Sequence, residues 1–344
     1  MKFLICFSAL SIVGSCATLS YKEKIQNIKD GISIDQPDKI VHYASTITSN
    51  ELKEHLYEFA SSDFQGRGLG TFGQKLAANY LKDYYISQDI PSPLANSVYF
   101  QHIPKNVLGI EQDGSENVLA YIEGSEKPEE IIVLSAHLDH KGMDDDGNIF
   151  YGADDDGSGT VALLEMAEAF NMAKKEGFGP KRSILFLHLT AEEAGLQGSR
   201  YYVNNPAFPL ENTVSNLNID MIGRIDRSHQ NNPNYIYLIG ADRLSKELHY
   251  ISEKVNSTFY NLDLDYKYND ENDSNRYYYR SDHYNFASHN IPVIFYFNGE
   301  HEDYHQITDT PDKINYPLLE KRTRLIFATA WQLANQEGRI KLDN

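Results

Sequence analysis

The sequence alternates between short apolar runs and segments of helical periodicity, and this alternation restricts the fold more than any other feature. Apolar runs within 129–140, 181–191, 215–223 and 291–299 are typical of buried strands. Segments such as 159–173 and 317–336 carry apolar residues at helical spacing. Strands that alternate with helices form mostly parallel sheets covered on both faces. The sequence therefore predicts an α/β fold, a three-layer α/β/α sandwich with a mostly parallel, mixed central sheet.

The bulk composition limits the classes of partner. The chain has 344 residues, of which 41% are hydrophobic, and this is enough for a substantial core. A formal net charge of −18 disfavours general binding to nucleic acid phosphates or anionic lipid. We expect a tether over 17–48, which is polar and weakly patterned, and a single domain over 49–344. The stretch 261–280, rich in Asn, Asp and Tyr, is expected to be a surface insertion.

The first residues have the pattern of an export signal. A basic residue, Lys2, precedes an apolar run over 3–14 that is too short to cross a bilayer. The tetrad that ends at Cys16 resembles the lipobox of bacterial lipoproteins, so we predict a signal peptide over 1–16 and a lipid on Cys16. The protein would then be anchored at the cell envelope, and this lipid would be its one contact with a membrane. Cleavage after Ala17 is the alternative, and it would give a freely secreted protein.

Polar residues gather where the predicted strands end, which is where ligands bind in open α/β sheets. His137 and Asp139 end the first of these strands and are two residues apart, so they point to the same side. Asp139 can accept a hydrogen bond from the imidazole while the other ring nitrogen binds a metal. A strand-end histidine beside a solvated aspartate is the alternative.

Three consecutive aspartates, Asp154, Asp155 and Asp156, stand before the helical segment at 159. Carboxylates are favourable at a helix N-terminus, which is one explanation, and a carboxylate that bridges two cations is the other. An EF-hand loop does not fit, because Gly152 stands where the first acidic ligand belongs.

Carboxylates also end the next two strands. Glu192 and Glu193 are adjacent, so we expect one to bind metal and the other to move protons near a metal-bound water. Asp220 ends the following strand in the same way. Each of these residues could also be an ordinary cap or helix-start residue. Together, however, successive strand ends offer the ligand types that zinc accepts along one edge of the sheet.

Six segments, taken together, resemble metallopeptidase family 28, the co-catalytic zinc exopeptidases that include bacterial aminopeptidases. They are AHLDH, GADDDGSG, LTAEEAGLQGS, NIDMIG, SDHYNF and EDYHQITDTPD, and they occur in the family's order. The resemblance extends from about residue 52 to 314. Many bacterial relatives carry an inserted protease-associated domain, whereas here only a short segment separates Ile90 from Ile131. We therefore expect a bare catalytic domain.

The resemblance implies two Zn²⁺ ions and assigns their ligands. One ion would be held by His137 and Asp220 and the other by Glu193 and His305, with Asp155 as the bridge. A cis peptide bond often follows the bridging aspartate in the family.

The resemblance also implies the residues that act on the substrate. Glu192 would be the general base and acid, Asp139 would orient His137, and Tyr304 would stabilise the carbonyl oxygen, as a tyrosine there does in some members. These residues imply a di-zinc exopeptidase that uses metal-bound hydroxide to remove N-terminal residues from peptide substrates. Carboxypeptidase action and the oligomeric state stay open.

Three other interpretations fit parts of the sequence. His301 to His305 spells the H-E-x-x-H motif of zincin endopeptidases, which requires a helix, but a strand precedes it and Pro311 follows soon after. A glutaminyl cyclase shares this fold and works with one zinc. A non-catalytic relative is the third possibility, although every proposed ligand and Glu192 are present.

Overall fold

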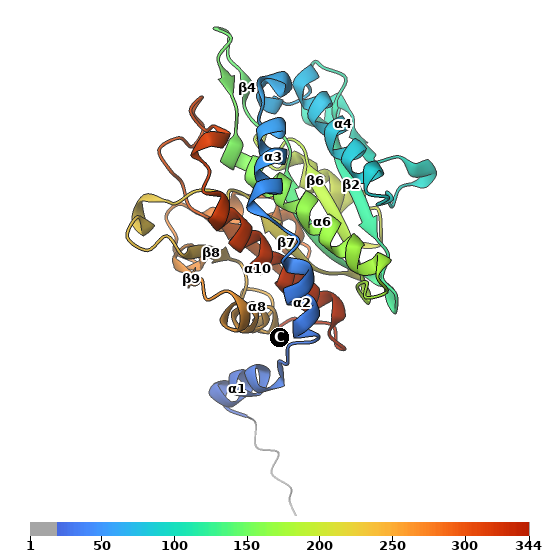
Figure 1. The fold of residues 1–344 in the computed structure, drawn as a ribbon, viewed down its shortest axis with the longest axis vertical. Coiled ribbons are helices and arrows are strands. Elements are labelled where there is room, and N and C mark those ends of the chain that lie inside the picture. Colours follow the sequence, from blue (N-terminus) through green and yellow to red (C-terminus); the bar gives the residue numbers. More distant parts are fainter. Residues whose placement is uncertain (1–18, 344) are drawn as a thin grey trace, which may run out of the picture.

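A computed structural model describes residues 19–343, and their central element is an eight-stranded mixed sheet. Its strands are β1 (Phe100–Ile103), β2 (Ser115–Ile122), β3 (Lys127–His137), β6 (Arg182–Leu189), β7 (Thr213–Ile219), β8 (Tyr235–Ile239), β9 (Asp263–Asp265) and β10 (Val293–Phe297). The strand order is β1-β2-β6-β3-β7-β10-β8-β9 (Figure 1). The four central strands, β6, β3, β7 and β10, are parallel, whereas β2 and β8 flank them in the antiparallel direction. The predicted mostly parallel, mixed sheet is confirmed.

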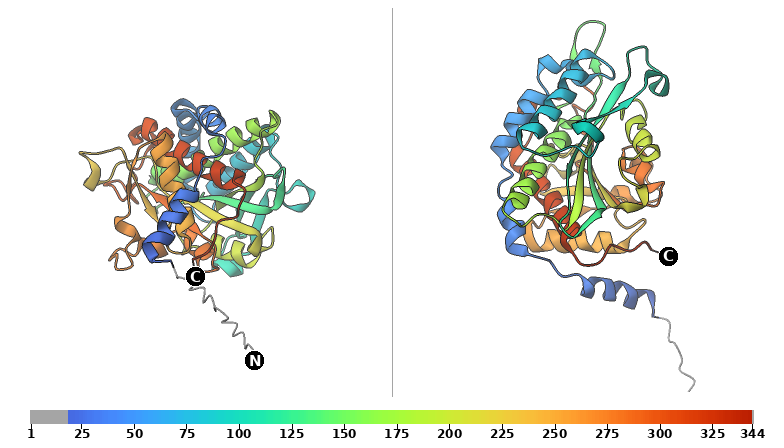
Figure 2. Two further views of the ribbon diagram at one scale, coloured as in Figure 1. Left: turned by 90° about the horizontal axis from the view of Figure 1, so that it is seen from below. Right: turned by 90° about the vertical axis from the view of Figure 1, so that its right-hand side faces the viewer.

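Helices cover both faces of this sheet, as the edge-on view in Figure 2 shows. The helices of residues 19–343 are α1 (Tyr21–Gly31), α2 (Pro37–Ala44), α3 (Ser49–Phe59), α4 (Phe72–Ser87), α5 (Lys105–Leu108), α6 (Gly159–Lys175), α7 (Gln197–Asn204), α8 (Lys246–Phe259), α9 (His283–Ala287) and α10 (Tyr316–Asn335). The larger core cluster joins α2, α3, α4, α6, α8 and α10 to one face, and a second cluster joins α7 and α9 to the other. This arrangement is the predicted α/β/α sandwich.

Strand β3 shows why the central strands read as continuous apolar runs. Its side chains alternate between the two faces, so that Ile132 and Leu134 enter the larger core cluster while Ile131 and Val133 enter the second. Both faces are therefore buried, and no polar alternation remains in the sequence.

The predicted tether over 17–48 is wrong for its second half. Helix α2 lies in this segment, and its Ile40 and Tyr43 are fully buried. The Tyr43 ring stacks on Trp331 of α10 at 5.4 Å between centroids. The domain therefore begins near Pro37, and the few apolar positions of so short a helix gave too weak a pattern to be recognised among polar neighbours.

The predicted signal peptide over 1–16, with Cys16, lies outside the described residues, and export and lipidation stay predictions. Within 19–343, no helix is long and apolar enough to span a bilayer.

Two connecting segments contribute to the sheet itself. The segment 91–130 provides β1 and β2, which form one edge of the sheet. The segment 261–280, expected to be a surface insertion, instead provides β9, which pairs with β8 in parallel. Its Tyr268 and Tyr277 are buried in a cluster with Phe297. Part of the expected insertion is therefore core.

Candidate metal centre

The carboxyl ends of β3, β6, β7 and β10 meet at one edge of the sheet because these strands are parallel. This edge receives the end of β3, the loop after β6, the end of β7 and the loop after β10. The turn at Ala153–Ser158, before α6, packs against the same edge. The five predicted ligands come from these segments, and the fold brings all of them together: His137, Asp155, Glu193, Asp220 and His305.

The ligand atoms form two groups that share Asp155. In one group, His137 Nε2 lies 3.2 Å from Asp155 Oδ1 and 3.6 Å from Asp220 Oδ1. In the other, His305 Nε2 lies 3.1 Å from Asp155 Oδ2 and 3.2 Å from Glu193 Oε1. The two oxygens of Asp155 therefore face different groups, as a bridging carboxylate requires.

The donor atoms fit metal ions better than they fit one another. His137 Nε2, Asp155 Oδ2 and Glu193 Oε1 are buried, and none has a hydrogen-bond partner among the described residues. A buried polar atom without a partner costs roughly 1–3 kcal/mol, and carboxylates crowded together repel one another. A divalent ion at each group would satisfy these atoms and balance their charge. Imidazole nitrogen and carboxylate oxygen are donors that zinc accepts.

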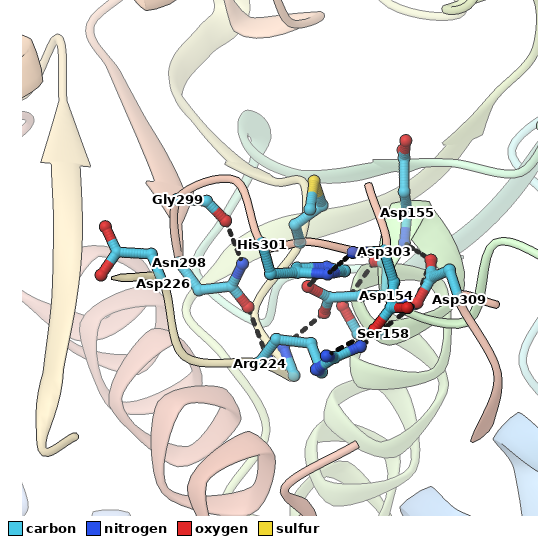
Figure 3. A network of polar contacts seen from close by, with 12 residues as sticks. Asp154, Asp155, Ser158, Arg224, Asp226, Asn298, Gly299, His301, Asp303 and Asp309 are labelled. Carbon is cyan, nitrogen blue, oxygen red and sulfur yellow. Dashed lines mark hydrogen bonds and ion pairs between the residues drawn. The ribbon is translucent and has the colours of Figure 1, made fainter. Parts of the chain in front are cut away.

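The three adjacent aspartates point in different directions. Asp154 accepts a hydrogen bond from the backbone N–H of Gly223 at 2.7 Å and lies 3.1 Å from His301 Nε2. The Asp309 carboxylate accepts hydrogen bonds from the backbone N–H groups of Asp154 (3.0 Å) and Asp155 (3.2 Å). Figure 3 shows the Asp155 side chain pointing away from this network. The network therefore fixes the backbone of the bridging residue and leaves its carboxylate free.

Asp156 ties the surrounding strand ends together. Its carboxylate accepts hydrogen bonds from the backbone N–H groups of His137 (3.1 Å), Met221 (3.1 Å) and Gly159 (3.0 Å). These bonds connect β3, the end of β7 and the start of α6. The peptide bond between Asp155 and Asp156 is cis, as the resemblance implies.

The pKa values of two carboxyl groups in the site, those of Asp155 and Glu192, shift in opposite directions. Burial opposes ionisation of Asp155, but the imidazoles of His140 and His137 outweigh it and hold its pKa well below the ordinary value. Burial raises the pKa of Glu192 well above its ordinary value, and the charge of His137 only partly offsets this rise.

The predicted role of Asp139 is wrong in its detail. His137 Nδ1 lies 3.0 Å from the backbone carbonyl oxygen of Asp139, whereas the nearer carboxylate oxygen is 3.9 Å away. The carboxylate instead accepts a hydrogen bond from the backbone N–H of Glu192 at 3.2 Å. Asp139 therefore orients His137 through its backbone and positions the Glu192 loop through its side chain. Strand β3 ends at His137, so the regular alternation of its side chains does not extend to Asp139.

Tyr304 lies beside the second group of ligand atoms. Its ring stacks on that of His305 at 3.8 Å between centroids. Burial, with the charges of Asp155 and Asp220, raises the pKa of Tyr304, so its hydroxyl stays protonated and can donate a hydrogen bond. That it donates to a substrate carbonyl stays a prediction.

The H-E-x-x-H sequence does not form a zincin helix. Residues 301–305 lie in turns after β10, and His305 has a left-handed backbone with φ of 57°. The His301 side chain points to Asp154 and not to the ligand atoms, and its Nε2 lies 3.1 Å from Asp154 Oδ2. His305 is therefore a loop residue, as expected.

Sequence reasoning missed Arg67, which lies in the glycine-rich turn between α3 and α4. Its guanidinium is 1% exposed and donates to the backbone carbonyls of Leu138 (3.0 Å), Tyr151 (2.8 Å) and Gly152 (2.8 Å), and to that of Phe59 (3.2 Å). Leu138 lies between His137 and Asp139, and Gly152 precedes the aspartate triplet. One buried cation thus fastens the two loops that carry His137 and Asp155.

Arg67→Met should lower the free energy of unfolding by about 3–4 kcal/mol, because it leaves buried carbonyls without donors. Urea unfolding of the metal-free protein would measure this change. The exposed Arg227 is a matched control, and Arg227→Met should unfold like the wild type. Equal midpoints for the two variants would show that Arg67 does not hold these loops.

Sequence reasoning also missed His140, whose ring is buried against Glu193 and Asp155. Its position three residues after His137 was the available signal. The loops that enclose the ring are distant in sequence, so its burial could not be inferred.

The model of peptidase family M28 matches residues 117–330, which is more than half of the chain. The chain belongs to peptidase family M28. The matched stretch contains every predicted ligand. Zinc is the metal named among the relatives and structural neighbours of this chain.

Relatives in sequence carry several peptidase names. A probable glutamate carboxypeptidase LAMP1 of Arabidopsis thaliana is 36% identical over 106 residues, which is 30% of this chain and 14% of that protein. Leupeptin-inactivating enzyme 1 of Streptomyces exfoliatus is 28% identical over 240 residues, which is 63% of this chain and 48% of that protein. The chain thus spans from about a seventh to a half of the length of these relatives.

Solved structures share the fold over most of the chain. The LapA aminopeptidase of Legionella pneumophila superposes with a TM-score of 0.68 at 20% identity, covering 89% of this chain and 77% of that one. A zinc aminopeptidase from Bacillus subtilis gives 0.66 at 15% identity, covering 86% and 98%. A glutaminyl cyclase of Bacteroides thetaiotaomicron, bound to N-acetylhistamine, gives 0.66 at 19% identity, covering 85% and 99%. The fold alone does not separate these activities.

Proposed function

We propose that this M28 peptidase is a di-zinc aminopeptidase that removes N-terminal residues from peptides. The observation that carries the proposal is the geometry of Asp155, whose two carboxylate oxygens face separate groups of ligand atoms. A carboxylate in that position can hold two ions close together, about 3.5–4 Å apart in two-metal hydrolases.

The residues around Asp155 have two separate roles, metal binding and proton transfer. Two zinc ions bound there would polarise the scissile carbonyl and supply hydroxide at neutral pH. Glu192, which lines the same pocket as Asp155 and Asp220, takes the proton of the attacking water and returns it to the leaving amine. Its raised pKa suits this exchange, because a carboxylate of higher pKa is the stronger base.

Cyclase activity is the competing proposal, since a glutaminyl cyclase shares the fold. A cyclase of this kind works with one zinc and needs one group of ligands. The present chain places two groups of donors on either side of Asp155, and this favours the peptidase.

The pocket beside the ligands favours an apolar side chain next to a free amine. Its floor is made of buried Met221, Phe295 and Phe297. At its rim, Arg280 Nη2 lies 3.2 Å from Glu300 Oε1, so this cation is already paired. Two carboxylates that line the pocket without being proposed ligands, Glu192 and Glu300, would attract an ammonium group and repel a carboxyl terminus.

An assay with aminoacyl anilides tests the proposal. Leucyl and phenylalanyl anilides should be hydrolysed fastest, aspartyl anilide slowly, and N-acetylated anilides not at all. A zinc chelator should abolish the activity and added zinc should restore it. Release of C-terminal residues from N-blocked peptides would instead make the protein a carboxypeptidase. One zinc per chain, with ammonia released from N-terminal glutamine, would make it a cyclase.

A further inference from the structure

His140 is a buried imidazole that hydrogen bonding does not explain. Its side chain is 2% exposed, and neither ring nitrogen has a hydrogen-bond partner among the described residues. Yet Nδ1 lies 3.1 Å from Glu193 Oε1 and 3.7 Å from Asp155 Oδ2. The nitrogen is thus close to both oxygens without hydrogen-bonding geometry to either. Atoms arranged in this way suit coordination of a common ion.

The surrounding backbone is shaped to hold this ring. The N–H of His140 donates to the carbonyl oxygen of Arg67 at 3.2 Å, and Gly68 forms a β-bridge with His140. On the other side, a Cβ on Gly152 would lie 2.6 Å from two atoms of the imidazole. Only glycine leaves room for the ring there. Two distant loops therefore fix His140 with Nδ1 turned towards the ligand oxygens.

The same two oxygens also face His305, whose Nε2 lies 3.1 Å from Asp155 Oδ2 and 3.2 Å from Glu193 Oε1. The other oxygen of Glu193 is engaged by Lys141 Nζ at 2.8 Å, so Glu193 offers the ion a single oxygen. Resting on the proposed di-zinc function, we propose that His140 is a further ligand of the ion held by Asp155, Glu193 and His305.

This ligand makes the two ions unequal. The ion at His140 would have four protein ligands, as in closed structural zinc sites, whereas the ion at His137 and Asp220 would have three and an open position, as in catalytic sites. The pocket is lined by residues of both groups, Asp220 of one and His305 of the other, together with Glu192, whereas His140 is buried and does not line it. The open position of the ion at Asp220 would make it the one that meets water and the substrate carbonyl.

Cobalt substitution tests the assignment, because the visible spectrum of Co²⁺ reports its ligands directly. We expect His140→Ala and His140→Asn to change the visible bands of one cobalt site and to weaken the binding of one of the two ions at least tenfold, in competition with a coloured chelator. His42→Asn, which removes an exposed imidazole, should leave both measurements as in the wild type. Weaker binding with an unchanged cobalt spectrum would overturn the proposal, since loss of a residue outside the coordination sphere also lowers affinity.

X-ray absorption on the zinc-loaded wild type makes the test independent of any variant that fails to fold. The proposal expects three imidazoles for every two zinc ions, and these are contributed by His137, His140 and His305. Two imidazoles for every two zinc ions would overturn it. Failure of the proposed function looks different: the wild type would then bind a single zinc or hydrolyse no free-amine anilide.

Discussion

Glu192→Gln is expected to lower kcat by about 10²–10⁴-fold while the zinc content and KM stay close to those of the wild type. The amide has nearly the same size as the carboxyl group but cannot take up a proton. The backbone N–H of residue 192 still donates to Asp139, so the loop keeps its position. Steady-state kinetics on leucyl anilide, with metal analysis of the same samples, would measure the effect.

A matched substitution separates this effect from a general loss of charge. Glu129 is exposed near the start of β3, at the end of the strand opposite His137, and Glu129→Gln should be fully active. Activity of Glu192→Gln within a few fold of the wild type would remove Glu192 as the base. A fall in activity that follows a fall in zinc content would make Glu192 a metal-binding residue instead.

Asp155→Ala should cost the protein both ions, because each group of donors loses the oxygen that the two groups share. Loss of several kcal/mol of metal-derived stabilisation of the transition state corresponds to at least about a 10³-fold fall in kcat/KM. Zinc per chain after dialysis, measured by mass spectrometry, should fall from two to well below one.

Asp145 offers the control for this substitution, because it is exposed at the tip of the hairpin formed by β4 (Gly142–Met143) and β5 (Ile149–Phe150). Asp145→Ala should keep both ions and full activity. If Asp155→Ala kept two zinc ions, the bridging role would be refuted and two independent sites would have to replace it.

Much of the fold and the site follows from the sequence because parallel strands end at one edge. The ends of β3 and β7 provide His137 and Asp220, and the residues after β6 provide Glu193, so strand prediction alone brings these three together. His305 follows β10 in a loop without regular structure, and only the family resemblance pointed to it as a loop ligand.

The residues that escaped prediction depend on contacts between loops. Arg67 is a buried charge, which is rare, and three of its four carbonyl partners come from segments about 70 to 85 residues away in the sequence. The burial of His140 likewise depends on Gly68 and Gly152. No local pattern encodes such contacts. Helix α2 escaped for another reason, since too few of its residues are apolar to mark a periodic face.

The N-terminal helix and the catalytic edge lie at opposite ends of the molecule. Helix α1 packs against α8 at one end, whereas hairpin β4–β5 and the ligand loops stand at the other (Figure 1). If the chain were attached to a surface through its N-terminus, the catalytic edge would lie on the side away from that surface. Substrates would then reach the site from the solvent, so peptides too large to pass between the protein and the surface would still be processed.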